Sequence, residues 1–178
     1  MNKNGLDNRS REKKVGLWVG GVSTFLLVSF FLVPFYLPEG SVPKLSGRAN
    51  AFDYHSEDGW GNIQTSGNGD VGHNQSEYGE FVWSDLDPYA AFIYGFGDLN
   101  CHTKAERSWE VNGNQMPVCV RDVGIFLGIA IGGFLFSRKG FNRWTIRDTF
   151  LSLLPDRVMG PVYKNDKRLL AMFVIAGI

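Results

Sequence analysis

Four side chains near the middle of the chain have the chemistry of a metal site or of a redox-active pair: Cys101, His102, Cys119 and Asp122. Two sulfurs, one imidazole nitrogen and one carboxylate oxygen make a tetrahedral ligand set that suits zinc. Cys101 and Cys119 are also the only cysteines in the sequence, and in an oxidising compartment they can form a disulfide instead. The residue types therefore predict either a metal site or a structural crosslink.

The spacing of these residues leaves both interpretations open. Neighbouring side chains on a helix point about 100° apart, so Cys101 and His102 can face one ion only if the backbone is not helical there. If a helix begins at Pro117, Cys119 and Asp122 share one face of its first turn, where the helix dipole lowers the pKa of a thiol. A disulfide would stabilise the fold by about 3 kcal/mol on the chain-entropy estimate.

Enzymatic chemistry at the same residues is a third interpretation. It would be thiol–disulfide exchange by the two cysteines, or metal-assisted hydrolysis with Glu106 or Asp122 as the base. The sequence contains no H-E-x-x-H element, no glycine-rich phosphate loop, and no nucleophile, base and orienting group at a recognisable motif spacing. We therefore favour a structural disulfide over a zinc site, and both over an enzyme.

Two arginines flank the cysteines, and they also have two interpretations. Arg107 and Arg121 can pair with acidic neighbours such as Glu106, Glu110 or Asp122, or with lipid phosphate. Beside a metal or a thiolate, they can instead hold an anionic ligand. We favour structural pairing.

The chain that positions these residues begins with a long apolar run. Residues 15–37 contain no charged side chain, and a helix of that length extends about 34 Å, against a hydrocarbon layer of about 30 Å. A cleaved signal peptide is the alternative, but the run is longer than a signal peptide requires and no small-x-small cleavage site follows Pro38. The sequence predicts a retained transmembrane helix.

The charges along the chain predict its orientation. Residues 1–14 carry five basic and two acidic side chains, residues 38–122 carry five and thirteen, and residues 138–168 carry eight and three. By the positive-inside rule, the first and third segments are cytoplasmic and the second lies outside. The balanced total gives no indication of nucleic-acid binding, and the expected partner is the lipid bilayer of the cell membrane.

The extracytoplasmic part is expected to contain two portions. Residues 38–83 are rich in glycine and polar residues, and this composition predicts a mobile loop. Residues 84–117 predict a cap, in which Asp87 and Pro88 begin a short re-entrant or interfacial helix and Asn112-Gly113 forms the type I′ turn of a hairpin.

A second spanning helix is expected at residues 118–137, with Pro117 in its first turn and basic residues after its end. Gly124, Gly128 and Gly132 recur every four residues on one face of this helix. This small-xxx-small spacing allows close approach of another helix, so a helix–helix partner is expected there.

The remaining residues predict a cytoplasmic amphipathic segment at 138–168 and the start of a third transmembrane helix at 169–178. Ten residues extend only about 15 Å as a helix, half of a span. The fold class is therefore an all-α, multi-pass helical membrane protein with a small helix-hairpin cap, a cytoplasmic N-terminus and a truncated C-terminus.

Three short elements in order resemble a known family. Residues 101–102 read Cys-His, residues 106–108 read Glu-Arg-Ser, and residues 117–121 read Pro-Val-Cys-Val-Arg. They are similar to the prokaryotic membrane-protein family called domain of unknown function 2085 (DUF2085), which typically reads Cys-His-Gln, Glu-Arg-Ser and Pro-Val-Cys-Ala-Arg-Cys-Thr-Gly-Ile-Tyr-x-Gly. The resemblance covers about 30 residues.

The resemblance implies a multi-pass membrane protein without an assigned molecular function. Thr103 replaces the family's usual glutamine, and Asp122 replaces the second cysteine of Cys-Ala-Arg-Cys. A dithiol switch within that motif is therefore impossible in this chain. Aspartate is itself a zinc ligand, so the exchange keeps a donor at the fourth position.

Overall fold

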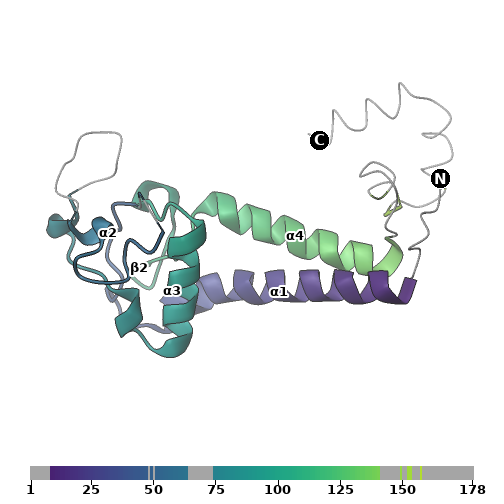
Figure 1. The fold of residues 1–178 in the computed structure, drawn as a ribbon, viewed down its shortest axis with the longest axis horizontal. Helices are drawn as coiled ribbons and strands as arrows, with labels where there is room; N and C mark the ends of the chain where they lie inside the picture. The colour runs from purple at the N-terminus through teal and green to yellow at the C-terminus, as the bar shows by residue number, and fades with distance from the viewer. Residues whose placement is uncertain are drawn as a thin grey trace, which may run out of the picture. The chain divides into compact units, whose positions relative to one another are not determined.

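The computed structural model describes residues 9–47, 49, 51–63, 74–140, 149, 152–153 and 157 (Figure 1). The predicted third helix at 169–178 lies outside the described residues, as does most of the predicted amphipathic segment at 138–168. The elements in chain order are α1 (Arg9–Tyr36), α2 (Trp60–Ile63), η1 (Gln75–Glu77), η2 (Trp83–Asp85), α3 (Pro88–Asn100), η3 (Ala105–Arg107), β1 (Glu110–Val111), β2 (Asn114–Gln115) and α4 (Val120–Lys139).

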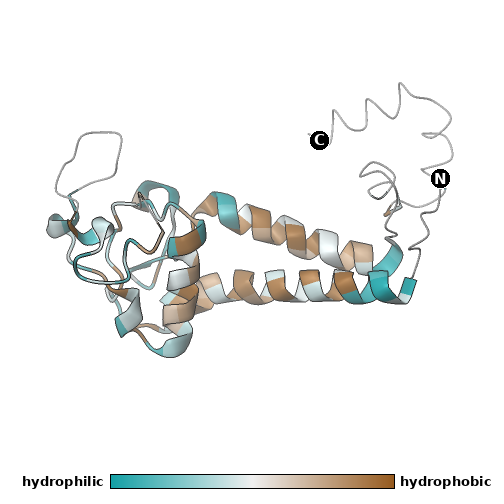
Figure 2. Ribbon diagram, viewed as in Figure 1, coloured by the Kyte–Doolittle hydropathy of each residue, from teal (hydrophilic) through white to brown (hydrophobic). Residues whose placement is uncertain are grey.

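Two of these helices, α1 and α4, are long and apolar enough to cross a membrane. Their 28 and 20 residues extend about 42 and 30 Å. Within the chain, only 33% of the most apolar 18-residue stretch of α1 and 22% of that of α4 are buried, whereas the core helix of a soluble protein is mostly buried. Apolar residues follow both helices along their length in Figure 2. The prediction of two apolar helices in a mostly helical chain is confirmed.

The second helix begins two residues later than the predicted start at residue 118. Pro117 and Val118 are buried outside the helix, and α4 begins at Val120. The Cys119 carbonyl accepts hydrogen bonds from the backbone N–H groups of Asp122 (2.9 Å) and Val123 (3.1 Å). Cys119 therefore occupies the position just before the first helical residue, where a carbonyl already takes part in helix bonding.

The contacts divide the chain into two compact units, residues 22–129 and residues 1–21 with 130–178. In the second of these units, the backbones of α1 and α4 touch through glycines. A Cβ on Gly16 would lie 2.7 Å from the Gly133 carbonyl oxygen, and a Cβ on Gly133 would lie 2.6 Å from the Gly20 nitrogen. We call residues 9–21 and 130–140 the helix pair.

The glycines of the helix pair differ from the three that the sequence analysis selected. A Cβ on Gly124, Gly128 or Gly132 would meet nothing within 4 Å among the described residues. Spacing alone identified a small-residue stripe on α4, but it could not show that the adjacent Gly133 makes the close contact with α1. A helix partner for the stripe stays a prediction.

Residues 37–119, which link α1 to α4 and which we call the connecting region, contain most of the hydrophobic core. Phe30 and Val33 of α1 pack there with Ala90 and Ile93 of α3 and with Met116, all fully buried. Phe30 also stacks on Phe96 of α3, with ring centroids 6.1 Å apart. The C-terminal part of α1 is therefore covered by residues of the connecting region.

Side-chain amides, rather than a β-sheet, form hydrogen bonds with much of the backbone in the connecting region. Four of its described residues are in β-strands. Buried Asn114 accepts from the Val42 N–H (2.9 Å) and donates to the carbonyls of Pro34 (3.0 Å) and Pro38 (3.1 Å). The side-chain amides of Gln115 and Gln75 form similar hydrogen bonds with the backbone of residues 44–46. The bond from Asn114 to Pro34 satisfies a carbonyl in the last turn of α1, where helix carbonyls lack a helical partner.

Two predictions about the connecting region are confirmed and one differs. The Asp87 carboxylate caps α3 by accepting from the Tyr89 and Ala90 N–H groups. Asn112 and Gly113 link β1 and β2 with φ of 53° and 69°, as a type I′ turn requires. Residues 38–83 were expected to form a mobile loop, yet their described part includes buried Val42, Leu45 and Tyr54. Scattered apolar residues and amides pack this segment despite its polar composition.

Candidate functional site

The ends of two helices bring the two cysteines together. Cys101 directly follows α3, and its N–H donates to the Gly97 carbonyl (2.7 Å). Cys119 directly precedes α4. The close approach depends on Gly97, because a Cβ at that position would lie 2.0 Å from the Pro117 carbonyl oxygen. A glycine in the last turns of α3 thus lets residues 117–119 pass close to this helix.

Cys101, Cys119 and Asp122 form a compact, buried group. One ligand atom from each residue lies within 4.8 Å of the other two, and the exposed fractions of the residues are 0, 6 and 9%. The Cys119 thiol donates to Asp122 Oδ2 (3.2 Å), and the Cys119 N–H donates to Cys101 Sγ (3.2 Å). Both cysteines are free thiols in the structure.

The buried Cys101 sulfur accepts hydrogen bonds from two backbone N–H groups. Besides the Cys119 N–H, the Thr103 N–H donates to it. Burial, and after it the Asp122 carboxylate, raise the pKa of the Cys101 thiol to about 12, although the two N–H groups act in the opposite direction. Without a cation, Cys101 is therefore a neutral thiol at neutral pH. A metal ion would displace this proton, and the N–H groups would then stabilise the bound thiolate.

His102 is exposed and lies outside this group. The backbone of Cys101 is extended, with φ of −120° and ψ of 156°, and adjacent side chains on an extended backbone point to opposite sides. The structure therefore brings together three of the four side chains that the sequence analysis assigned to a metal site.

Thr103 is a further residue of the site, and the sequence analysis gave it no role beyond a departure from the family pattern. It is buried and has a positive φ of 47°, which is uncommon for a β-branched residue. Among the described residues, its hydroxyl has no hydrogen-bond partner. This conformation aims the Thr103 N–H at Cys101, and no short-range pattern in the sequence signals it.

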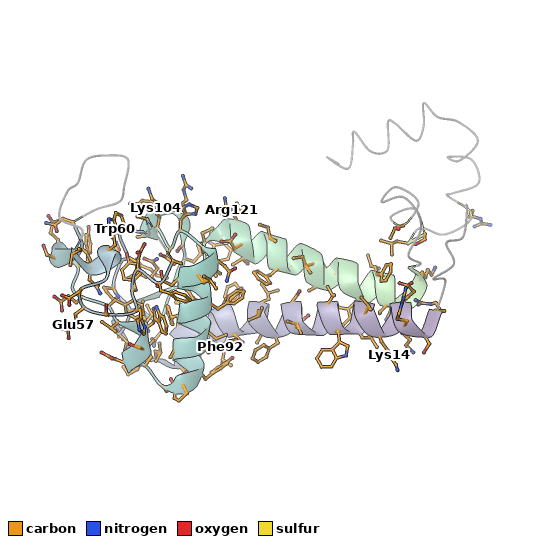
Figure 3. All side chains as sticks on the ribbon, viewed as in Figure 1. Lys14, Glu57, Trp60, Phe92, Lys104 and Arg121 are labelled. Atoms are coloured by element: carbon orange, nitrogen blue, oxygen red, sulfur yellow. The ribbon has the colours of Figure 1, made fainter. Side chains whose placement is uncertain are left out.

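The two arginines lie beside the cysteines rather than among them. Arg121 Nε is 3.5 Å from Asp122 Oδ1, so this carboxylate contacts Arg121 with one oxygen and Cys119 with the other. Figure 3 shows the Arg121 side chain projecting outward from the start of α4. Residues 106–109 and 119–121 line a pocket of about 360 Å³. The pocket therefore includes both arginines and adjoins the buried cluster at Cys119.

The comparison with protein families agrees with the resemblance drawn from the sequence. Residues 101–160 match the family model described as "Predicted membrane protein (DUF2085)". The match covers 60 of the 178 residues and includes the cysteine cluster and α4. No curated protein and no solved structure matches the chain.

Proposed function

The region from residue 101 to residue 160 belongs to the DUF2085 family of predicted membrane proteins, and on this premise we propose a multi-pass protein of the cell membrane with a structural zinc centre. In this proposal, α1 and α4 span the bilayer, the N-terminus is cytoplasmic and the connecting region lies outside. Cys101, Cys119 and Asp122 would supply three of the four ligands of the zinc ion, with water as the fourth, and would fasten the end of α3 to the start of α4.

Exposure and charge support the membrane part of the proposal. Large apolar side chains such as Trp18 and Phe35 of α1 and Ile131 of α4 are exposed in the chain, and in water such surfaces are costly. Basic residues Arg138 and Lys139 end α4, while Lys13 and Lys14 precede the apolar part of α1. The positive-inside rule places these basic ends in the cytoplasm.

The observation that carries the zinc proposal is the convergence of three buried ligand atoms. Tetrahedral zinc with bonds of about 2.3 Å to sulfur and 2.0 Å to oxygen separates two thiolates by about 3.8 Å, and a thiolate from a carboxylate oxygen by about 3.5 Å. Cys119 Sγ and Asp122 Oδ2 are 3.2 Å apart, and all three ligand atoms lie within 4.8 Å. Little protein movement is needed to admit the ion.

A disulfide between Cys101 and Cys119 is the second candidate. The two sulfurs are already close, and the proposed extracytoplasmic location is oxidising enough to keep a disulfide. Formation of the disulfide would bring the two sulfurs to about 2.05 Å from each other. It would also abolish the hydrogen bond that the Cys119 thiol donates to Asp122. Both candidates give the cluster a structural role, but only zinc uses the carboxylate.

The two candidates are distinguished by the metal content and thiol state of the purified full-length protein. We expect one equivalent of zinc and two thiols that react with an alkylating agent only after chelation. Cys101→Ser and Asp122→Asn should lose the metal, whereas His102→Ala should retain it because His102 is exposed outside the group. The disulfide candidate predicts a different result: a mass about two hydrogens below that of the reduced protein, cysteines that do not react with the alkylating agent, and no zinc. That result would rule out the zinc site.

A further inference from the structure

The pocket beside the cysteine cluster is lined by two arginines whose hydrogen-bond donors are largely unused within the described part of the chain. Arg107 and Arg121 both line it, with Glu106 as the single acid. Among the described residues, no hydrogen bond or salt bridge involves the Arg107 guanidinium. Arg121 contacts Asp122, but its side chain is 63% exposed. Both guanidinium groups therefore have donors available for a ligand in the pocket.

The first turn of α4 adds backbone donors on the same side. Val120 and Arg121 are its first two residues, and both line the pocket. In the described part of the chain, no acceptor takes their backbone N–H groups. The start of a 20-residue helix also carries a partial positive charge that attracts anions.

Two apolar residues, Trp109 and Val120, indicate that the pocket lies at the edge of the apolar helix surface. Trp109 lines the pocket, and its ring lies 6.1 Å from that of Phe31 in α1. Tryptophan is enriched where membrane and water meet. Val120 is both a lining residue and the first residue of α4, and it is exposed. In the proposed membrane orientation, the pocket lies at the level of the outer headgroups.

We propose that this pocket binds the phosphodiester group of a membrane phospholipid. Arg107, Arg121 and the N–H groups at the start of α4 donate to the phosphate oxygens, and the acyl chains follow the exposed apolar surface of α4. Planar guanidinium groups suit phosphate because they donate two parallel hydrogen bonds. This inference rests on the proposed membrane insertion of α1 and α4, and not on the zinc site.

Glu106 defines which headgroup fits best. A headgroup whose only charge is negative would be repelled by this carboxylate, which lines the same pocket. Phosphoethanolamine carries an ammonium group next to its phosphate, so it can face Glu106 with the ammonium and the arginines with the phosphate. The pocket should therefore prefer phosphatidylethanolamine to phosphatidylglycerol.

The test measures binding of short-chain phosphatidylethanolamine to the full-length protein in detergent by isothermal titration calorimetry. Removing both charges in an Arg107→Gln and Arg121→Gln double variant should weaken binding by about tenfold or more. The control variant Arg11→Gln removes an exposed arginine that, like Arg121, pairs with the acidic residue next to it but does not line the pocket, and it should bind as the unaltered protein does. Equal binding by the double variant and the unaltered protein would overturn the proposal.

Further titrations identify the source of the phosphate and the role of Glu106. Inorganic phosphate should bind far more weakly than the lipid, and equal or tighter binding of phosphate would overturn the assignment to a lipid. Glu106→Gln should reduce the preference for phosphatidylethanolamine over phosphatidylglycerol. An Arg107→Lys and Arg121→Lys double variant, which keeps the charges, should show intermediate binding if the bidentate geometry matters.

The same samples separate failure of this inference from failure of the proposed function. Membranes containing the protein are washed with alkaline carbonate before purification, and an integral protein stays in the pellet. A protein that stays in the pellet but does not bind the lipid contradicts the pocket assignment alone. A protein released by carbonate contradicts the membrane insertion on which both proposals depend.

Discussion

The connecting region and the helix pair satisfy their backbones in different ways. In the helix pair, helical hydrogen bonds use the backbone groups internally, and glycine contacts let α1 and α4 approach until their main chains touch. Among the described residues of 37–80, few are in helices or strands, and buried carboxamides bind the backbone there instead. At a lipid-exposed surface only the first arrangement is stable, because lipid offers no hydrogen-bond partner to irregular backbone that the protein does not cover.

This difference has a consequence for how each part tolerates change. A carboxamide such as that of Asn114 bonds to several buried groups at once, so its loss leaves the Val42 N–H and the Pro34 carbonyl without the partner that they have. A glycine contact involves close packing alone, and a larger residue there can be accommodated by a small separation of the helices. We therefore expect polar substitutions in the connecting region to cost more than packing substitutions in the helix pair.

The largest effect is expected for Asn114→Ala. This change leaves two buried groups unsatisfied, the Val42 N–H and the Pro34 carbonyl, whereas the Pro38 carbonyl keeps hydrogen bonds from Ser41. Because each unsatisfied buried group costs about 1–3 kcal/mol, we expect a loss of about 4 kcal/mol in the free energy of unfolding. Chemical unfolding in detergent, followed by tryptophan fluorescence, measures it.

The matched control for Asn114 is Asn100→Ala. Asn100 is exposed, and its side chain donates one hydrogen bond, to the Phe96 carbonyl. We expect this change to cost less than about 1 kcal/mol. Similar losses for the two variants would mean that buried amides do not hold the connecting region together.

A smaller effect is expected for Gly133→Val in the helix pair. The new side chain would begin 2.6 Å from the Gly20 nitrogen, so α1 and α4 must separate or distort, at a cost of about 2–3 kcal/mol. The neighbouring Gly132→Val is the control, since nothing lies within 4 Å of its Cβ position among the described residues. Disulfide crosslinking between cysteines introduced into both helices measures the separation.

The same pair of variants also examines the predicted glycine stripe. If Gly132→Val reduces stability as much as Gly133→Val does, a further helix must contact the face of Gly124, Gly128 and Gly132. If only Gly133→Val has an effect, the stripe carries no close contact. The second outcome would remove the helix–helix partner that the spacing predicted.

Local patterns in the sequence were sufficient to predict α1, α3, α4 and the hairpin of β1 and β2, but not the short helices of the connecting region. The long apolar runs indicated two helices, Asp87-Pro88 indicated the start of α3, and Asn112-Gly113 indicated the turn between β1 and β2. Each of these signals acts over a few neighbouring residues, because capping, turn geometry and hydropathy depend on the local chain. The grouping of Cys101 with Cys119 was also expected from their types.

Contacts between distant residues could not be derived in this way. The approach of Gly97 to Pro117, which brings the cysteines together, depends on how α3 packs against residues 117–119. The exclusion of His102 follows from the extended backbone at Cys101, and no residue type there predicts that conformation. The hydrogen bonds between side-chain amides and the backbone of residues 42–46 join residues up to 72 positions apart in the sequence. Only the folded chain specifies such partners.

A moderate effect is expected for Tyr94→Phe in α3. The buried Tyr94 hydroxyl donates to the Gln115 carbonyl (2.7 Å), and loss of this bond should cost about 1–2 kcal/mol. Burial also raises the pKa of Tyr94, so its stabilising contribution is full below about pH 10 and declines as the pH rises further, because the unfolded chain ionises first. Unfolding between neutral and alkaline pH should therefore be less pH-dependent in the variant.

Tyr89→Phe provides the comparison for Tyr94. Its hydroxyl donates to Ser29 Oγ (2.7 Å) and is only partly buried, and the Ser29 hydroxyl already donates to the Phe25 carbonyl. We expect a cost below about 1 kcal/mol at neutral pH. A larger effect at Tyr89 than at Tyr94 would place the stronger polar contact on α1 rather than within the connecting region.

The smallest effect is expected for Tyr36→Phe, at the boundary between α1 and the connecting region. The Tyr36 hydroxyl donates to Asp87 Oδ2 (2.7 Å), and this bond is the largest cause of the lowered pKa of Asp87. A carboxylate with a lowered folded-state pKa stabilises the protein above the ordinary pKa of about 3.9, and this stability is lost as the pH falls through the folded value. Because the pair is exposed, we expect a loss of at most about 0.5 kcal/mol at neutral pH.

Thermal unfolding between pH 2.5 and pH 7, at about half-unit intervals, measures this loss, and the difference from the unaltered protein should shrink towards the acid end. Asp87→Asn is the control background, because it keeps a side-chain oxygen for capping α3 but removes the titrating charge. In that background, Tyr36→Phe should have the same effect at every pH. A difference that grows on acidification would mean that Tyr36 favours the protonated carboxyl, and the contact would then stabilise α3 only in acid.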